Sequence, residues 1–312
     1  MLKKINAVFF GTPDFSVPSL DLLANHPYIN LKYVVSMPDR PAGRGQKLKS
    51  PEVIEYAQSK KIKTFQTENI NREKDFISKI NEEEIDVFIV LAFAQFLGEK
   101  LLNIPKMGCF NIHTSLLPKY RGAAPIQYAI LNGDKETGVS IQKMVKQMDA
   151  GDLVYEKSIQ IHPEETGGQL YTRLKLAAAL GLNNFIYDLV NDSLTYKKQN
   201  EDNVSFAPTL KKNQGFINFK DETFDEIKNK VRALYPWPGT YCKLNGKRLK
   251  VYHVEKSDSS LNAGEAKIIN SQLIIGCKDA SLRLNDVQIE GKKRCYDVDL
   301  INGLQNKELL IN

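Results

Sequence analysis

Cysteine is scarce in this sequence, and no two cysteines form the short pairs that hold zinc. Only four of the 312 residues are cysteine (Cys109, Cys242, Cys277 and Cys295), and the four histidines show no metal-ligand spacing with them or with one another. These absences argue against a small domain held by disulfides and against a zinc module. We expect reduced, structural thiols and no metal.

Long apolar runs are also lacking. The longest, residues 87–94, has eight residues, whereas a membrane-spanning helix needs about 20. Lys3 and Lys4 precede apolar residues, as they would in a secretory signal, but Asn6 interrupts that run and the turn-forming residues 11–14 end it. We expect a cytoplasmic protein with no membrane association.

The composition is that of a globular protein with unevenly placed charge. Hydrophobic residues make up 42% of the chain and charged residues 26%, which is enough for one or two domains with real cores. The formal net charge is +6, and residues 205–312 account for most of it, with 18 Lys and Arg against 13 Asp and Glu. A basic C-terminal third suits a polyanionic partner such as nucleic acid, although spare lysines also serve as an ordinary solvated surface.

Strand-like and helix-like segments alternate in the first half of the chain. Three short apolar runs, residues 5–10, 31–36 and 86–91, are each followed by turn-forming residues. Between them lie two helical stretches, one capped by Ser16 and one that begins after Ser50 with Pro51. Strands that are apolar on both faces and alternate with helices predict an α/β fold with a Rossmann-like, mostly parallel sheet.

The second half continues this pattern and then changes. It predicts strands at residues 108–112, 138–145 and 153–161, and helices at residues 125–133 and 169–190. Past a polar stretch, a helix near residues 224–234 precedes short alternating segments at residues 240–244, 249–254, 267–275 and 281–289, which predict a small β-barrel. We therefore expect domains at residues 1–190 and 205–312, joined by a linker at residues 191–204.

The predicted strand at residues 108–112 ends in the densest group of polar side chains, that of Asn111 and His113. Residues two apart on a strand point to the same side, and catalytic groups gather at the carboxyl ends of strands in open α/β sheets. An amide can hydrogen-bond a developing oxyanion and an imidazole can carry protons near neutral pH, as acyl transfer requires. Taken alone, the pair is explained as well by a turn-capping asparagine and a partly buried histidine.

The residues around this pair resemble a family signature. Asn-x-His at 111–113 is followed by Ser-Leu-Leu-Pro at 115–118, by Arg-Gly at 121–122, and by Asp149, which lies 36 residues beyond His113. In this order the motifs resemble the folate-dependent formyltransferases, and the resemblance covers nearly the whole chain. It implies that Asn111, His113 and Asp149 are catalytic and that 10-formyltetrahydrofolate is the co-substrate.

The resemblance also implies how the three residues act. A neutral amine attacks the formyl carbon and leaves a tetrahedral intermediate with a negative oxygen. We expect Asn111 and His113 to donate hydrogen bonds to that oxygen. Asp149 would orient His113, stabilise its protonated form and help to relay the proton through a water. Ser115 lacks the Gly-x-Ser-x-Gly context of a hydrolase nucleophile, so no covalent intermediate is expected.

A folate site follows from the same resemblance. Its implied members are Ser115, Leu116, Leu117 and Pro118, together with Phe93 and Leu97 of the segment 90–97. That segment departs from the family pattern at Ala94, where a glycine is common, so close approach of the backbone to the pterin should differ slightly there.

Residues 38–48 form a flexible, basic segment rich in glycine and proline. On its own it reads as a solvated surface turn, but it resembles the loop with which formyltransferases of initiator tRNA enter the acceptor arm. The resemblance implies that Arg44 is the main tRNA contact, with Arg40 and Lys47 supporting it. Further along, residues 206–208 and 231–239 resemble the family's second domain, an OB-like barrel that cradles tRNA.

These observations predict an enzyme of translation initiation. We expect a monomer that moves the formyl group of 10-formyltetrahydrofolate to the amino group of initiator methionyl-tRNA. The main alternative is a sugar-nucleotide amine N-formyltransferase, and glycinamide ribonucleotide formyltransferases and formyltetrahydrofolate hydrolases share the same three residues. A non-catalytic RNA-binding module is a further alternative, against which the intact set of Asn111, His113 and Asp149 argues.

Overall fold

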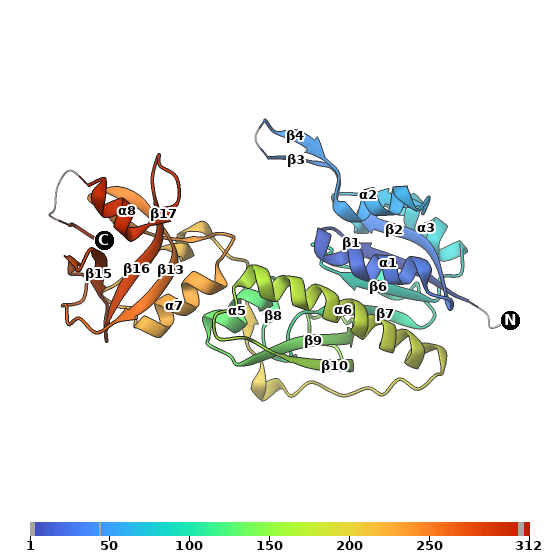
Figure 1. The fold of residues 1–312 in the computed structure, drawn as a ribbon. Helices are drawn as coiled ribbons and strands as arrows, with labels where there is room; N and C mark the ends of the chain where they lie inside the picture. Colours follow the sequence, from blue (N-terminus) through green and yellow to red (C-terminus); the bar gives the residue numbers. More distant parts are fainter. Residues whose placement is uncertain (1–3, 44, 305–308) are drawn as a thin grey trace. The chain divides into compact units, whose positions relative to one another are not determined.

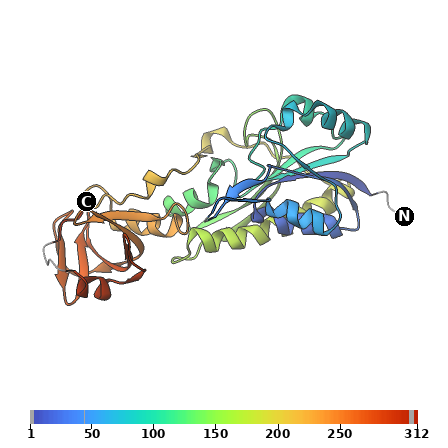
Figure 2. The same cartoon turned by 90° about the horizontal axis from the view of Figure 1, so that it is seen from above.

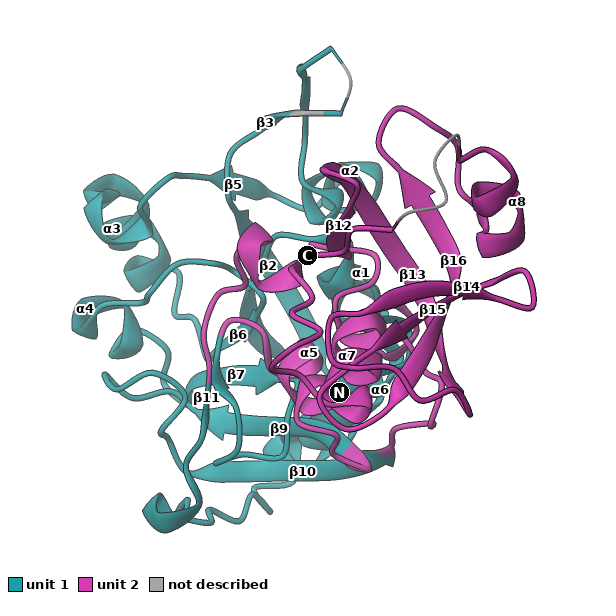
Figure 3. Cartoon of the chain, turned by 90° about the vertical axis from the view of Figure 1, so that its left-hand side faces the viewer, with its two compact units in different colours: residues 1–122, 137–159, 171–206 teal, residues 123–136, 160–170, 207–312 magenta. Residues whose placement is uncertain are grey.

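The computed structural model describes residues 4–43, 45–304 and 309–312. The chain divides into two compact units (Figure 3). Unit 1 consists of residues 1–122, 137–159 and 171–206, and unit 2 of residues 123–136, 160–170 and 207–312. The contacts thus group two internal segments with the C-terminal part of the chain, and the linear division at residues 190 and 205 stays a prediction.

Unit 1 is built on a seven-stranded sheet (Figure 1). In spatial order its strands are β10 (Leu153–Gln160), β9 (Glu136–Lys143), β7 (Gly108–His113), β6 (Val87–Leu91), β1 (Ile5–Gly11), β2 (Ile29–Ser36) and β5 (Thr64–Gln66). The strands from β7 to β5 pair in parallel, whereas β9 joins β7 in antiparallel register. The predicted Rossmann-like, mostly parallel sheet is confirmed.

Helices cover both faces of this sheet, which is why its central strands are apolar throughout. The helices are α1 (Val17–Asn25), α2 (Glu52–Ser59), α3 (Lys74–Glu82), α4 (Glu99–Leu102) and α6 (Gly167–Val190). In Figure 2, α3 lies on one side of the sheet and α1 on the other. All five residues of β6 are buried between the two layers. The sequence gives no apolar run long enough to predict α4 or β5, and both are short.

Aromatic side chains fill one face of the core. The ring centroid of Phe10 lies 5.0 Å from that of Phe88 and 5.3 Å from that of Phe93. All three rings are buried, and each contributes roughly 1.5–3 kcal/mol through removal of apolar surface from water. This packing holds the strand ends of β1 and β6 in place.

The first helix begins where the sequence predicts, but Ser16 does not cap it. The Ser16 hydroxyl is buried and donates to the carbonyl oxygen of Leu91 at 2.7 Å. It therefore ties the start of α1 to the end of β6. The predicted capping role of Ser16 is wrong because a buried hydroxyl takes the acceptor within reach, and here that acceptor belongs to another strand.

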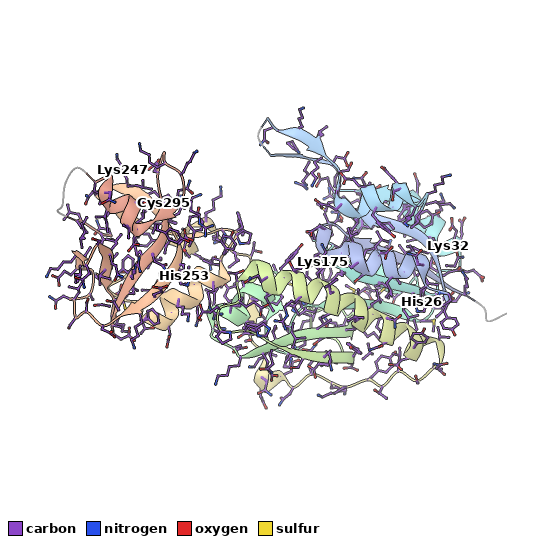
Figure 4. All side chains as sticks on the ribbon, in the orientation of Figure 1. His26, Lys32, Lys175, Lys247, His253 and Cys295 are labelled. Atoms are coloured by element: carbon purple, nitrogen blue, oxygen red, sulfur yellow. The ribbon has the colours of Figure 1, made fainter. Side chains whose placement is uncertain are left out.

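Helix α6 also contacts the segment between β1 and α1. Lys175, labelled in Figure 4, places its Nζ atom 2.6 Å from Asp14 Oδ2. The Tyr171 hydroxyl donates to Asp14 Oδ1, also at 2.6 Å. Two successive turns of α6 thus hold the segment that connects β1 with α1.

The basic segment at residues 38–48 is not irregular throughout. Its ends form β3 (Arg40–Ala42) and β4 (Lys47–Lys49), which pair antiparallel in a hairpin that projects away from the sheet (Figure 1). At its base Arg40 pairs with Glu68 at 2.7 Å and Lys49 with Glu52 at 2.6 Å. Both pairs are largely exposed, so each adds little to stability.

Unit 2 is an antiparallel β unit with three helices. The helices are α5 (Pro125–Leu131), α7 (Phe224–Ala233) and α8 (Asp297–Asn302), and the strands are β12 (Thr240–Leu244), β13 (Lys247–Ser257), β14 (Ala266–Ile269), β15 (Gln272–Gly276), β16 (Ser281–Ile289) and β17 (Cys295–Tyr296). The strands pair antiparallel in the order β12-β13-β16-β15-β14, with β17 beside β16. This confirms the predicted small β domain after the α/β domain.

The remaining elements are short. They are the strand pair β8 (Arg121–Gly122) and β11 (Phe206–Ala207) and the 3₁₀ turns η1 (Asp14–Ser16), η2 (Ile70–Arg72), η3 (Glu201–Asn203) and η4 (Lys212–Gly215).

One predicted strand of unit 2 is wrong in its extent. Residues 267–275 form the two strands β14 and β15 of a hairpin, because Asn270 and Ser271 between them have φ angles of 50° and 60°. Two successive left-handed residues make the tight turn that suits a two-residue hairpin. The apolar pattern continues across this turn, so it hides the reversal of the chain.

All four cysteines are free thiols. Cys242 is fully buried, and burial raises the pKa of its thiol to about 12. In the described part of the chain, no helix has both the length and the apolarity needed to cross a membrane.

An ion pair between a buried carboxylate and a partly exposed arginine holds the helix α8 to the β-sheet of unit 2. Asp297 is 0% exposed and accepts hydrogen bonds at 2.8 Å from both Arg283 Nε and Arg283 Nη2, and at 3.0 Å from the Leu273 backbone N–H. Burial by itself would raise the pKa of Asp297, but the bonds from Arg283 and Leu273 outweigh it and leave the pKa below its ordinary value.

Replacement of this carboxylate should destabilise unit 2. We expect Asp297→Asn to lower its free energy of unfolding by about 2 kcal/mol, because the buried position loses charge-assisted hydrogen bonds from the partly exposed Arg283. The lowered pKa means that the carboxylate stabilises the fold above the unfolded pKa of about 3.9 and that this contribution disappears as the pH falls below it. Urea unfolding followed by fluorescence of Trp237, the only tryptophan and a residue of unit 2, measures both effects. Exposed Asp258→Asn is the matched control; equal stability of the two variants would contradict the expectation.

Candidate active site

Asn111 and His113 lie in the last half of β7, where the parallel part of the sheet meets its antiparallel extension. The register places Asn111 opposite Gln142 of β9 and His113 opposite Ser140. Because side chains alternate along a strand, Asn111 and His113 point to the same side of the sheet. Asn111 is partly exposed and His113 is buried.

Asp149 meets this pair from the loop between β9 and β10. Its Oδ1 atom accepts from Gln142 Nε2 at 2.9 Å and from Asn111 Nδ2 at 3.3 Å. Its Oδ2 atom accepts from the backbone N–H of Gly122 at 2.9 Å. The Asp149 backbone has a φ of 51°, in the left-handed region that aspartate tolerates better than most residues. The carboxylate therefore gathers donors from three separate segments.

The imidazole of His113 is held between two oxygens. Its Nε2 atom lies 2.8 Å from the Tyr120 carbonyl oxygen, and its Nδ1 atom lies 3.8 Å from Asp149 Oδ2. A carbonyl oxygen can only accept, so Nε2 must carry a proton. The distance at Nδ1 exceeds a hydrogen bond. Nδ1 is therefore the ring nitrogen that can exchange a proton, and it does so beside a carboxylate.

The structure thus brings together the three residues that the sequence analysis predicts to be catalytic. An amide donor, an imidazole with one uncommitted nitrogen and a carboxylate lie within hydrogen-bond reach or close to it. Such a group can donate to a developing oxyanion and move a proton to or from it. Cys109, two residues before Asn111, is buried, and burial raises the pKa of its thiol to about 12, which keeps it uncharged and unsuited to nucleophilic attack.

The predicted folate residues after β7 occupy a hydrogen-bonded turn. Ser115 is buried and its hydroxyl donates to the Lys119 carbonyl oxygen at 2.6 Å. Ser140 Oγ donates to the Ser115 carbonyl oxygen at 2.8 Å and accepts from Leu117 N–H at 3.1 Å. Leu116 and Pro118 are partly exposed and so available to a ligand.

The other two predicted folate residues are placed differently. The side chains of Phe93 and Leu97 are buried in the core cluster of unit 1. In the segment between them Ala94 is exposed and has a φ of 65°, a left-handed conformation that glycine adopts without strain. Phe96 is the exposed aromatic side chain here, at 51%. Any contact of Phe93 and Leu97 with a ligand therefore has to use their backbone.

Two of the predicted tRNA-binding residues, Arg40 and Lys47, lie on the β3–β4 hairpin. Arg40 and Lys47 are exposed at its two strands, and the guanidinium of Arg40 pairs with Glu68. Arg44 lies outside the described residues.

Sequence reasoning missed the side chains that support the predicted ones. Gln142 bonds Asp149 directly, and Gln199 donates to the carbonyl oxygens of Asp149 at 2.9 Å and Gly151 at 2.8 Å. The alternation of β9 places Gln142 on the side of the catalytic pair once the register with β7 is known. No local signal marks Gln199, which is 50 residues from Asp149. Among the residues that the structure describes, no group of three or more His, Cys, Asp and Glu side chains is arranged to hold a metal ion.

The arrangement of His113 predicts its tautomer. We expect the neutral ring to carry its proton on Nε2, because that atom faces the Tyr120 carbonyl oxygen. The two-bond ¹⁵N–¹H spectrum of protein labelled at histidine distinguishes the tautomers, and with four histidines in the chain the spectrum stays simple. His113→Gln assigns the signal. A neutral His113 protonated on Nδ1 would contradict this geometry.

Comparison with known proteins agrees with these features. A family model described as "Formyl transferase" matches residues 3–185, and one described as "Formyl transferase, C-terminal domain" matches residues 209–305. The chain is 40% identical over 300 residues to a protein of Geobacter metallireducens named methionyl-tRNA formyltransferase, covering 96% of both chains. It is 36% identical over 300 residues to the protein of that name from Bacillus subtilis, covering 95% of this chain and 94% of the relative.

Solved structures share the fold at lower identity. An N-formyltransferase from Helicobacter canadensis, solved with folinic acid and dTDP-3-aminofucose, superposes with a TM-score of 0.67 at 22% identity and covers 90% of this chain and 98% of its own. HypX from Aquifex aeolicus, solved with tetrahydrofolic acid, has a TM-score of 0.61 at 13% identity and covers 95% of this chain and 46% of its own. With both family domains matched and relatives at 36–40% identity over nearly its whole length, the chain belongs to the formyl transferase family.

Proposed function

We propose that the protein transfers the formyl group of 10-formyltetrahydrofolate to the free amino group of initiator methionyl-tRNA. The observation that carries this proposal is that Asp149 accepts a hydrogen bond from Asn111 at 3.3 Å and lies 3.8 Å from His113 Nδ1. The choice of acceptor is supported by the relatives, which are named methionyl-tRNA formyltransferases and match nearly the whole chain. The basic hairpin at residues 40–49 suits a polyanionic acceptor.

The chemistry follows from the atoms that this group offers. The neutral amine forms a bond to the formyl carbon, and the carbonyl oxygen becomes negative. Asn111 donates to this oxygen from its amide nitrogen. The family resemblance implies that His113 donates to this oxygen as well, but its Nε2–H is engaged by Tyr120. The proton that the amine loses instead passes, directly or through a water, to His113 Nδ1. The bond from carbon to the folate nitrogen then breaks, and the same proton goes to that nitrogen as tetrahydrofolate leaves.

Asp149 has a supporting role in these steps. Its carboxylate lies 3.8 Å from His113 Nδ1, so it stabilises the imidazolium that forms when the amine loses its proton. It also holds the Asn111 amide at 3.3 Å, which aims the oxyanion donor. The amide, imidazole and carboxylate belong to unit 1 of a single chain, so we propose that a monomer is sufficient. Both proposed substrates are cytoplasmic, and we propose the same location for the enzyme.

Removal of either polar group beside His113 should abolish most turnover without unfolding the protein. We expect Asn111→Ala to lower kcat by about 10²–10³, the usual cost of one oxyanion donor, and Asp149→Ala to lower it at least as much. Radiolabelled formyl transfer to methionyl-tRNA measures the rate, and circular dichroism checks the fold. If either variant kept a rate near that of the wild type, these catalytic roles would be wrong.

The same assay decides between acceptors. A sugar-nucleotide amine N-formyltransferase is the second candidate, because solved neighbours of this fold act on such amines by name. We expect formylation of methionyl-tRNA and none of a nucleotide-linked amino sugar. The reverse result would replace the proposed acceptor and leave the catalytic group untouched.

Loss of Arg44 should affect tRNA alone. We expect Arg44→Ala to lower kcat/KM for methionyl-tRNA about tenfold or more, as the removal of one nucleic-acid contact does, with an unchanged KM for folate. Exposed Arg72→Ala in the same unit is the control for a change of one positive charge. Equal kcat/KM values for the two variants would contradict the predicted role of Arg44 in tRNA binding.

A further inference from the structure

The turn that carries Asp149 is held by polar side chains that the proposed chemistry does not use. Gln199, in the segment between α6 and β11, donates from Nε2 to the carbonyl oxygen of Asp149 at 2.9 Å and to that of Gly151 at 2.8 Å. The path of this segment is set two residues earlier, where Lys197 and Leu153 exchange backbone hydrogen bonds at 2.8 Å and 2.9 Å. These hydrogen bonds therefore hold the backbone that carries Gln199 beside the turn.

The orientation of the Gln199 amide is determined by Arg121. The Gln199 oxygen accepts from Arg121 Nε at 3.1 Å and from Arg121 Nη2 at 2.8 Å. A guanidinium only donates, so the oxygen end of the amide must face it and the NH₂ end must face the two carbonyl oxygens. Arg121 is 2% exposed and is held in turn by both carboxylate oxygens of Glu201, at 2.7 Å and 3.1 Å. The amide has no alternative orientation.

The turn needs this support from outside because its own backbone is unusual. Asp149 has a φ of 51°, in a region that side chains other than glycine rarely adopt. Gly151 packs so closely on β9 that a Cβ atom there would lie 1.7 Å from the Lys143 carbonyl oxygen. Gln142 bridges two residues of the turn, because it accepts from Gly151 N–H at 3.0 Å and donates to the Asp149 carboxylate at 2.9 Å.

Two glutamines thus hold different groups of the turn. Gln142 holds its carboxylate and Gln199 holds its backbone carbonyls, and the two amides approach each other at 3.5 Å. We infer that Gln199, with its orientation set by Arg121, is a positioning residue for the formyl transfer: it acts through Asp149 and touches no substrate. The segment that the sequence predicts as a linker would then belong to the catalytic apparatus. This inference rests on the proposed function.

The expected effect is on the rate of the chemical step. If Gln199 is lost, Asp149 can relax toward an ordinary backbone conformation, and its carboxylate moves relative to His113 Nδ1 and Asn111. Misplacement of a catalytic group by about 1 Å can cost 10²-fold in rate. The predicted folate residues, at 93, 97 and 115–118, and the predicted tRNA residues Arg40 and Lys47 are not among the residues that Gln199 bonds, so substrate binding should change little.

Gln199→Met tests this with a side chain of similar length that cannot hydrogen-bond to the turn. We expect kcat for formyl transfer to methionyl-tRNA to fall about 10- to 100-fold, with the KM of each substrate within threefold of the wild type and the melting temperature lowered by only a few degrees. Gln58→Met, at an exposed site on α2, is the matched control and should keep the wild-type rate. Gln199→Glu should lose at least as much, because its carboxylate would face two carbonyl oxygens.

Two further readouts separate positioning from a merely structural role. The pH dependence of kcat should change shape in Gln199→Met, since the carboxylate beside His113 has moved, whereas partial unfolding would scale kcat equally at every pH. In a double-mutant cycle, Arg121→Met and Gln199→Met should be strongly non-additive, because Arg121 acts by orienting the same amide. If Arg121→Met does not fold, Gln199→Met still decides the question.

The outcomes are distinct. A Gln199→Met enzyme with wild-type kcat, or with a raised KM and unchanged kcat, overturns the positioning role. A wild-type protein that formylates no methionyl-tRNA overturns the proposed function instead. Wild-type activity, loss of kcat in Gln199→Met and an altered pH profile together support the inference.

Discussion

The site depends on one carboxylate that is satisfied by donors from distant parts of the chain. Asp149 accepts from Gln142 and Asn111 on one oxygen and from Gly122 on the other, and it lies 3.8 Å from the His113 ring. A mostly buried carboxylate is costly unless each oxygen finds a donor or a counter-charge. These donors come from the neighbouring strands β7 and β9 and from β8, so the site exists only when the sheet has formed and β8 is in place.

The sheet contributes a precise register. Asn111 and Gln142 face the same carboxylate because β7 and β9 pair antiparallel with these two residues opposite each other. A slip of one residue would turn one of the two side chains to the other face. Because β9 runs antiparallel to β7, it ends beside Phe110, and the loop that follows it carries Asp149 to Gln142 and Asn111. Buried strands such as β6 fix this edge by packing on both faces.

A backbone carbonyl group determines which nitrogen of the His113 ring is free to exchange a proton. Because the Tyr120 carbonyl oxygen engages Nε2, the proposed proton transfer is confined to Nδ1, beside Asp149. In the proposed mechanism the ring can take up a proton without rotating. For recognition of the acceptor, the basic hairpin and unit 2 are the proposed candidates.

Much of the fold and the three central residues could be predicted from the sequence alone. Apolar runs determined which strands are buried, the two-residue spacing placed Asn111 and His113 on one side, and the family resemblance pointed to Asp149. The tertiary structure alone decided the roles of Ser16, Gln142 and Gln199, as well as the reversal of the chain between β14 and β15. The physical reason is the range of the interactions. Local pattern reflects burial and short-range backbone preference, whereas a buried hydroxyl or amide bonds whichever partner the register and the turns bring to it, and for Gln199 that partner is 50 residues away.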